Sequence, residues 1–137
     1  MSRILAVDFG TKRSGIAITD PLQIIASGLC TVSTDELLPF LVDYTQKEGV
    51  STIVFGAPKQ MDNTDSESEV FIQLFIEKLK EKLPHMPIAR QDERFTSKMA
   101  VASMIASGVK KKKRQDKALI DEISATLILQ DYLKSNA

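Results

Sequence analysis

The sequence predicts an α/β fold in which one mixed β-sheet carries helices on both faces. Three short apolar segments, at residues 3–9, 13–19 and 24–31, open the chain and are separated only by turn residues, which is typical of an antiparallel meander. From residue 33 onward, helical and strand-like segments alternate, which favours a sheet buried between helices. The expected order of elements is β-β-β-α-β-α-β-α.

The first half of the chain is predicted to hold four strands and one helix. The third strand follows a turn at Asp20-Pro21. Ser33 and Glu36 have the spacing of a capping box, and they predict a helix that continues to Gly49. Residues 51–56 are rich in β-branched and aromatic side chains, which indicates a fully buried fourth strand.

The second half is predicted to hold one strand among three helices. Apolar side chains recur at helical spacing over residues 70–83, and Pro84 ends that helix. Residues 88–91 form the last strand. A helix between Thr96 and Gly108 and a final helix over roughly residues 116–134 complete the chain.

Composition bounds the class of protein. With 137 residues and 43% hydrophobic content, we expect a single domain that spans residues 1–137. The 18 basic and 18 acidic residues exclude a generally polycationic protein, so nucleic-acid binding would require a local basic patch. Cys30 is the single cysteine, and the sequence lacks the pattern of a signal peptide or a membrane span, so we expect a cytoplasmic protein.

Asp8 is the first candidate functional residue because it lies in an otherwise apolar strand. Side chains alternate along a strand, so Asp8 shares a face with Ile4 and Ala6. A carboxylate in such surroundings costs several kcal/mol unless a charged group or hydrogen bonds compensate. Two explanations are open: a cation bound against Asp8, or a turn in which Asp8 accepts hydrogen bonds from the amides of residues 10 and 11.

Two further acids occupy unusual positions. Glu93 follows the last predicted strand, and Asp121 lies inside the final helix. The small side chains of Ser124 and Ala125 share a helical stripe with Asp121, and they would let this helix lie close to the sheet and bring Asp121 toward Asp8. Three converging carboxylates repel one another unless cations lie between them. Mg²⁺ or Mn²⁺ fits best, because these ions prefer oxygen ligands and pair with phosphate.

Three segments together resemble one known family. The segments "DFGTKRSGIAITD", "DERFTS" and "IDEISATLILQDYL" are similar to the signature stretches of the YqgF family, the RuvX-type pre-16S rRNA nucleases once described as Holliday junction resolvases. The resemblance covers nearly the whole chain. It implies an RNase H-like fold related to the RuvC resolvases, with a mixed five-stranded sheet, and a metal-dependent nuclease activity.

The resemblance also implies roles for the three acids. Asp8 matches the first-strand acid of the family, Glu93 the glutamate of its D-E-R motif, and Asp121 the acid of its last helix, so these three are the expected catalytic residues and ligands of Mg²⁺ or Mn²⁺. Asp92 and Glu122 are each one residue away from a matched acid and should point elsewhere.

Basic side chains near these acids are candidates for nucleic-acid binding. Arg13 and Arg94 flank two of the acids, where each could form an orienting ion pair or contact a phosphate. A basic run precedes the final helix, and it could contact phosphates beside the metal site or be a solvated surface; it consists of Lys110, Lys111, Lys112, Lys113 and Arg114.

Three functions are compatible with the sequence. The first is a nuclease that processes the 5′ end of pre-16S rRNA, or one that resolves Holliday junctions as a symmetric dimer. The second is a phosphate-handling ATPase of the actin, Hsp70 and sugar-kinase type, which would need two such domains. The third is a non-catalytic nucleic-acid-binding module. The expected partners are structured RNA or branched DNA and ribosome precursors, with no membrane, and the protein would be a monomer or a homodimer.

Overall fold

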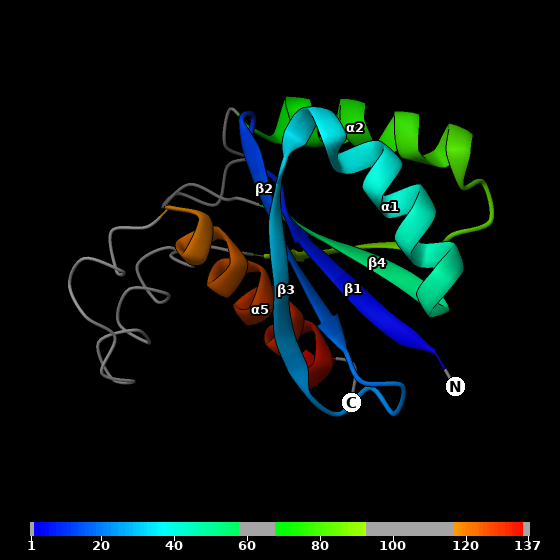
Figure 1. The fold of residues 1–137 in the computed structure, drawn as a ribbon, viewed down its shortest axis with the longest axis vertical. Coiled ribbons are helices and arrows are strands. Elements are labelled where there is room, and N and C mark those ends of the chain that lie inside the picture. Colours follow the sequence, from blue (N-terminus) through cyan, green and yellow to red (C-terminus); the bar gives the residue numbers. More distant parts are fainter. Residues whose placement is uncertain (1, 58–67, 93–116, 136–137) are drawn as a thin grey trace.

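The computed structural model describes residues 2–57, 68–92 and 117–135, which contain one five-stranded sheet and three helices (Figure 1). The strand order is β3-β2-β1-β4-β5. Strands β1, β2 and β3 are antiparallel neighbours, while β4 is parallel to β1 and β5 is parallel to β4. The predicted mixed sheet with an antiparallel start is therefore confirmed. The strands are β1 (Arg3–Asp8), β2 (Arg13–Thr19), β3 (Ala26–Ser33), β4 (Val50–Ala57) and β5 (Ile88–Asp92).

Helices cover both faces of this sheet, as predicted. Helices α1 (Thr34–Glu48) and α2 (Ser68–Lys82) lie on one face, and α5 (Lys117–Ser135) lies on the other (Figure 1). The alternation along β1 divides the core in two. Leu5 and Val7 join the cluster under α1 and α2, whereas Ile4 and Ala6 join the cluster under α5. No helix within the described residues combines the length and apolar character required to cross a membrane.

The third strand begins later than its apolar sequence predicts, at Ala26 rather than at Ile24. The carboxylate of Asp20 accepts hydrogen bonds from the backbone amides of Ile24 and Ile25, at 2.8 and 2.7 Å, and these bonds hold residues 20–25 in a turn. Both isoleucine side chains are exposed, at 68% and 64%. Here the apolar residues extend a turn rather than a buried strand.

Asp20 makes the stability of the fold depend on pH. The hydrogen bond from Ile25, and then those from Ile24 and Leu22, hold the pKa of Asp20 below its ordinary value of 3.8. A carboxyl whose pKa is lower in the folded state stabilises the fold above its unfolded pKa, and this stabilisation is lost as the pH falls through the folded pKa. We therefore expect Asp20→Ala to lower the midpoint of urea unfolding at neutral pH, and the difference from wild type to shrink at pH values below 3.8.

Asp43→Ala is the matched control for this experiment. Asp43 is an exposed acid whose partner is Lys47 one helical turn away, and such pairs contribute little. A loss of stability from Asp20→Ala that stays constant down to about pH 3, well into the carboxyl titration range, would contradict the assigned hydrogen bonds.

The start of α1 corrects one prediction. Ser33 does occupy the N-cap position, but its side chain makes no capping hydrogen bond, so the predicted capping box is absent. The loop between β1 and β2 binds the start of this helix instead: the Thr34 amide donates to the Lys12 carbonyl at 3.0 Å, and the Thr34 hydroxyl donates to the Gly10 carbonyl at 2.6 Å. The predicted end of the helix at Gly49 is confirmed, since this residue has φ 64° at the C-cap.

Candidate active site

The candidate site lies at the edge of the sheet where the three parallel strands end. β1, β4 and β5 end there at Asp8, Ala57 and Asp92, and the antiparallel strand β2 begins there at Arg13. The start of α5 also reaches this edge, because a Cβ atom added to Gly15 would overlap the backbone carbonyl of Asp121. Side chains from separate segments of the chain are therefore gathered at one end of the sheet.

Asp8 and Asp121 both lie beside Gly15. In the register of β1 and β2, Asp8 is the direct partner of Gly15, and the backbone of Asp121 lies against that glycine. Asp8 is half-buried at the end of the central strand, on the face that α5 covers. The small residues of α5 allow this close approach, since Ser124 and Ala125 are both fully buried. The two acids thus lie on one face of the sheet.

Arg13 forms an ion pair with Asp121. The Nε atom of Arg13 lies 2.6 Å from Oδ2 of Asp121, and the two side chains are 36% and 23% exposed. The structure shows an ion pair of Arg13 with an acid of the final helix, and a phosphate contact by Arg13 stays a prediction. The guanidinium balances the charge of Asp121 and restrains its carboxylate at the edge of the sheet.

Asp92 and Glu122, the acids next in sequence to Glu93 and Asp121, point away from the candidate site, as the sequence predicts. Asp92 shares a face of β5 with Arg90, which bonds to α2, so Asp92 lies on the face opposite to α5. The side chain of Glu122 lies against Gly28 on β3, where an added Cβ atom would overlap it. Burial raises the pKa of the Cys30 thiol, and the nearby charge of Glu122 raises it further, so this thiol stays protonated at neutral pH.

Several predicted site residues lie outside the described residues. They are Glu93, Arg94, Lys110, Lys111, Lys112, Lys113 and Arg114. Within residues 2–57, 68–92 and 117–135, no group of three or more His, Cys, Asp or Glu side chains could hold a metal ion. Asp8 and Asp121 nevertheless supply the hard oxygen donors that Mg²⁺ and Mn²⁺ prefer, and the last described residue of β5, Asp92, immediately precedes Glu93.

A hydroxyl network that sequence reasoning missed anchors the loop after Asp8. The buried hydroxyl of Ser14 accepts a hydrogen bond from the Gly10 amide at 3.3 Å and lies 3.0 Å from the hydroxyl of Thr34. Thr34 in turn donates to the Gly10 carbonyl. The turn-capping role considered for Asp8 would have to compete with Ser14 for the Gly10 amide. Because Thr34 is 20 or more positions from Ser14 and Gly10, no local pattern could reveal the whole network.

A second polar cluster supports the ends of β4 and β5 from the opposite face. Glu69 of α2 is only 7% exposed, and it accepts hydrogen bonds from both terminal nitrogens of Arg90, at 2.5 and 2.7 Å. Arg90 also donates to the Gly56 carbonyl at 3.1 Å, and Gln73 donates to Glu69 at 2.9 Å. This cluster fixes the strand that leads to Asp92. It could not be predicted from local sequence, since Glu69 and Arg90 are 21 positions apart and lie on a helix and a strand that meet only in the folded chain.

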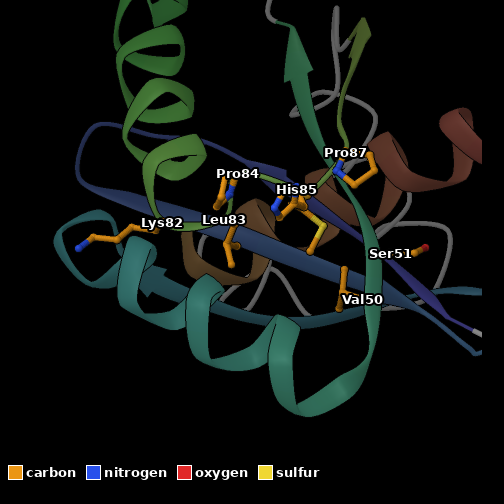
Figure 2. A pocket seen from close by; sticks show the side chains of 8 residues that line it. Val50, Ser51, Lys82, Leu83, Pro84, His85 and Pro87 are labelled. Carbon is orange, nitrogen blue, oxygen red and sulfur yellow. The ribbon is translucent and has the colours of Figure 1, made fainter.

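A cavity of about 380 Å³ lies at the other end of the sheet (Figure 2). It is lined by residues 82–87 and by Val50 and Ser51 at the start of β4. Val50 pairs with Arg3 at the start of β1, whereas Asp8 ends that strand, so the cavity is remote from Asp8. His85 at this cavity is exposed, and it has no place in chemistry at Asp8.

The chain is similar over nearly its whole length to one protein family and to several named proteins. The model of the RuvX family, described as "Holliday junction resolvase", matches residues 2–135. A protein of Christiangramia forsetii named "Putative pre-16S rRNA nuclease" is 62% identical over 133 residues, which cover 97% of this chain and 98% of the relative. Relatives of the same name from Flavobacterium psychrophilum and Bacteroides fragilis are 58% and 55% identical; each alignment covers 97% or 98% of both chains.

Two solved structures share the fold of this chain. RuvC of Thermus thermophilus, in complex with Holliday junction substrate, superposes with a TM-score of 0.58 at 11% sequence identity, covering 99% of this chain and 96% of that one. A second structure of Thermus thermophilus RuvC gives a TM-score of 0.57 at 12% identity. At these identities the likeness concerns the fold alone, and it confirms the RNase H-like fold that the resemblance implied.

Proposed function

The chain belongs to the RuvX family, and from this premise we propose that it is a divalent-metal-dependent nuclease that hydrolyses phosphodiester bonds during processing of the 5′ end of pre-16S rRNA. Membership of the family confirms the resemblance seen in the sequence. The observation that carries the proposal is the position of Asp8 and of the Asp121 backbone beside the same glycine, Gly15, at the edge where the parallel strands end. The names of the relatives support pre-16S rRNA as the substrate. We further propose that residues 1–137 act as a single domain in the cytoplasm.

In this proposal Asp8, Glu93 and Asp121 hold Mg²⁺ or Mn²⁺. The bound metal supplies charge that activates water and stabilises the departing oxygen of the phosphodiester. Asp8 provides a rigid carboxylate, because the paired strands β2 and β4 flank its strand. Asp121 provides a second one, which α5 brings to the same face and Arg13 restrains.

Basic side chains are proposed to bind the nucleic-acid backbone. Arg94 and the run from Lys110 to Arg114 are assigned to phosphate contacts, which would make binding weaken as salt rises. Arg13 is assigned primarily to Asp121, as the ion pair indicates.

The test is a cleavage assay on two labelled substrates side by side, a pre-16S rRNA fragment and a four-way DNA junction. Each is incubated with the full chain in Mg²⁺, in Mn²⁺ or in EDTA. We expect cleavage of the RNA that EDTA abolishes. Cleavage of the junction alone would instead favour the resolvase activity named in the family description, and sedimentation would then be expected to show a dimer. Binding without cleavage of either substrate would contradict the nuclease.

The Arg13–Asp121 pair gives a prediction about metal affinity. A guanidinium beside a carboxylate ligand opposes a divalent cation, and single and double charges about 6 Å apart in water repel by about 1.4 kcal/mol. Arg13→Met keeps most of the side-chain volume and removes the charge, so we expect Mn²⁺ to bind roughly tenfold more tightly in a calorimetric titration. Lys47→Met on α1 is the matched control, since it removes a cation from an exposed pair with Asp43. Equal or weaker binding in Arg13→Met would show that orientation of Asp121 outweighs the repulsion.

A further inference from the structure

A second cavity, of about 790 Å³, opens beside the loop that follows Asp8. It is lined by residues from this loop, from the start of α1 and from the outer side of α2. The lining includes Phe9, Asp35, Phe71, Leu74, Phe75 and Lys78. Its volume is within the range of sites for small ligands. It is a separate feature from the cavity of Figure 2, which lies at the other end of β4.

The floor of this cavity is aromatic and fixed by the core. Phe75 is only 9% exposed, and its ring centroid lies 5.4 Å from that of Phe9 and 5.8 Å from that of Phe55. Tilted aromatic pairs at these distances are favourable, so the floor is preformed.

The outer wall is also apolar, but it faces solvent. Phe71 and Leu74 lie one helical turn apart on α2, and each is 51% exposed. The rim carries one acid, Asp35, and one base, Lys78, both exposed. This combination suits a ligand with a flat, uncharged, partly polar ring. The phenyl groups would stack on the face of that ring, while Asp35 would accept a hydrogen bond from an amino group of the ligand and Lys78 would donate one to a carbonyl of the ligand. A phosphate is disfavoured, because the charges of Asp35 and Lys78 balance.

The cavity adjoins the candidate active site through one pair of neighbouring residues, Asp8 and Phe9. Phe9 directly follows Asp8, and the two lie on opposite faces of the sheet: Asp8 on the α5 side and Phe9 packed on the cluster under α1 and α2. A strand with a phosphate at Asp8 could therefore cross the edge of the sheet and place a neighbouring base against Phe9. Only an unpaired base exposes both its face and its hydrogen-bonding edge for this purpose.

We propose that this cavity binds an unpaired nucleobase next to the scissile phosphate, so that the enzyme selects single-stranded RNA over duplex at the cleavage point. The inference rests on the proposed function, because it concerns the substrate of the same site. It identifies Phe71 as a specificity-determining residue whose ring stacks on the base.

The chain contains no tryptophan, which allows a direct test by fluorescence. Phe71→Trp places a single indole at the cavity wall, and the titration uses a short single-stranded oligoribonucleotide, the same strand in a duplex, and an abasic version. Asp8→Asn is combined with Phe71→Trp and EDTA is present, so the readout needs no catalysis. We expect the single strand to quench the indole, and the duplex and abasic strands to quench it far less.

Val70→Trp is the matched control. Val70 directly precedes Phe71 on α2, is 63% exposed and does not line the cavity, so the indole of Val70→Trp should not respond. Phe71→Ala should weaken binding of the single strand roughly 5- to 150-fold, and Phe71→Tyr should restore it.

Three results would overturn the inference. They are equal quenching of both indoles, quenching by the duplex or the abasic strand that equals quenching by the single strand, and a change of oligomeric state in Phe71→Ala that shows the face to be a contact between two copies. The proposed function has a separate readout. Metal-dependent cleavage without quenching would contradict the proposed base site alone. Quenching without cleavage by the wild-type chain would contradict the proposed nuclease activity alone.

Discussion

Asp8→Asn is expected to abolish metal-dependent cleavage of the rRNA fragment and to leave RNA binding nearly unchanged. Asparagine has almost the shape of aspartate, so the half-buried end of β1 should keep its geometry. It lacks the negative charge that a hard divalent cation requires, and loss of a direct ligand should cost more than the 10- to 100-fold typical of outer-shell groups. The expected loss of cleavage rate is at least about a hundredfold, measured under single-turnover conditions beside a binding titration in EDTA.

Asp92→Asn is the control that tests which face of the sheet holds the metal site. Asp92 ends β5 at the same edge as Asp8, but it lies on the side of the sheet that α2 covers. We expect this variant to cleave at a rate close to that of wild type. If Asp92→Asn is inactive while Asp8→Asn retains cleavage, the metal site does not lie on the α5 face, and the proposed ligand set is wrong.

Much of the fold was predictable because burial on both faces leaves a clear sequence pattern. The apolar run of β4 and the change from strand to helix spacing after residue 33 reflect the constraint that a central strand contacts helices on both sides. This constraint is weaker at β3, the outermost strand, and at the turn that precedes it. Ile24 and Ile25 are apolar but exposed, and the hydrogen bonds of Asp20 decide the backbone there.

The candidate site was only partly predictable, and the reason is sequence separation. Asp8 and Asp121 could be identified because each is an acid in an apolar periodic segment, which is unfavourable without a partner. The partners themselves come from distant segments: Arg13 contacts Asp121, and Arg90 contacts Glu69. No periodicity connects such pairs, so only the folded arrangement shows that Asp121 is the acid with which Arg13 pairs.

Gly15→Ala is expected to destabilise the fold severely, because this glycine is the point at which α5 contacts the sheet. The added methyl group would overlap the carbonyl oxygen and carbon of Asp121, which are backbone atoms that cannot rotate away. Helix α5 would have to shift as a whole, against the buried contacts of Ala125 and Ile128. Overpacking of a core costs about 1–3 kcal/mol, and we expect a loss at or above the upper end of that range in urea unfolding.

Gly28→Ala separates this effect from the general cost of replacing a strand glycine. Gly28 also faces α5, but its added methyl group would meet the side chain of Glu122, which is partly exposed and can rotate toward solvent. The expected loss is about 1 kcal/mol or less. Any Gly15→Ala protein that remains folded should also bind Mn²⁺ more weakly than Gly28→Ala, because the displaced helix carries Asp121 away from Asp8. Equal losses of stability in the two variants would mean that the backbone contact at Gly15 does not set the position of α5, and the geometric basis for pairing the two acids would fail with it.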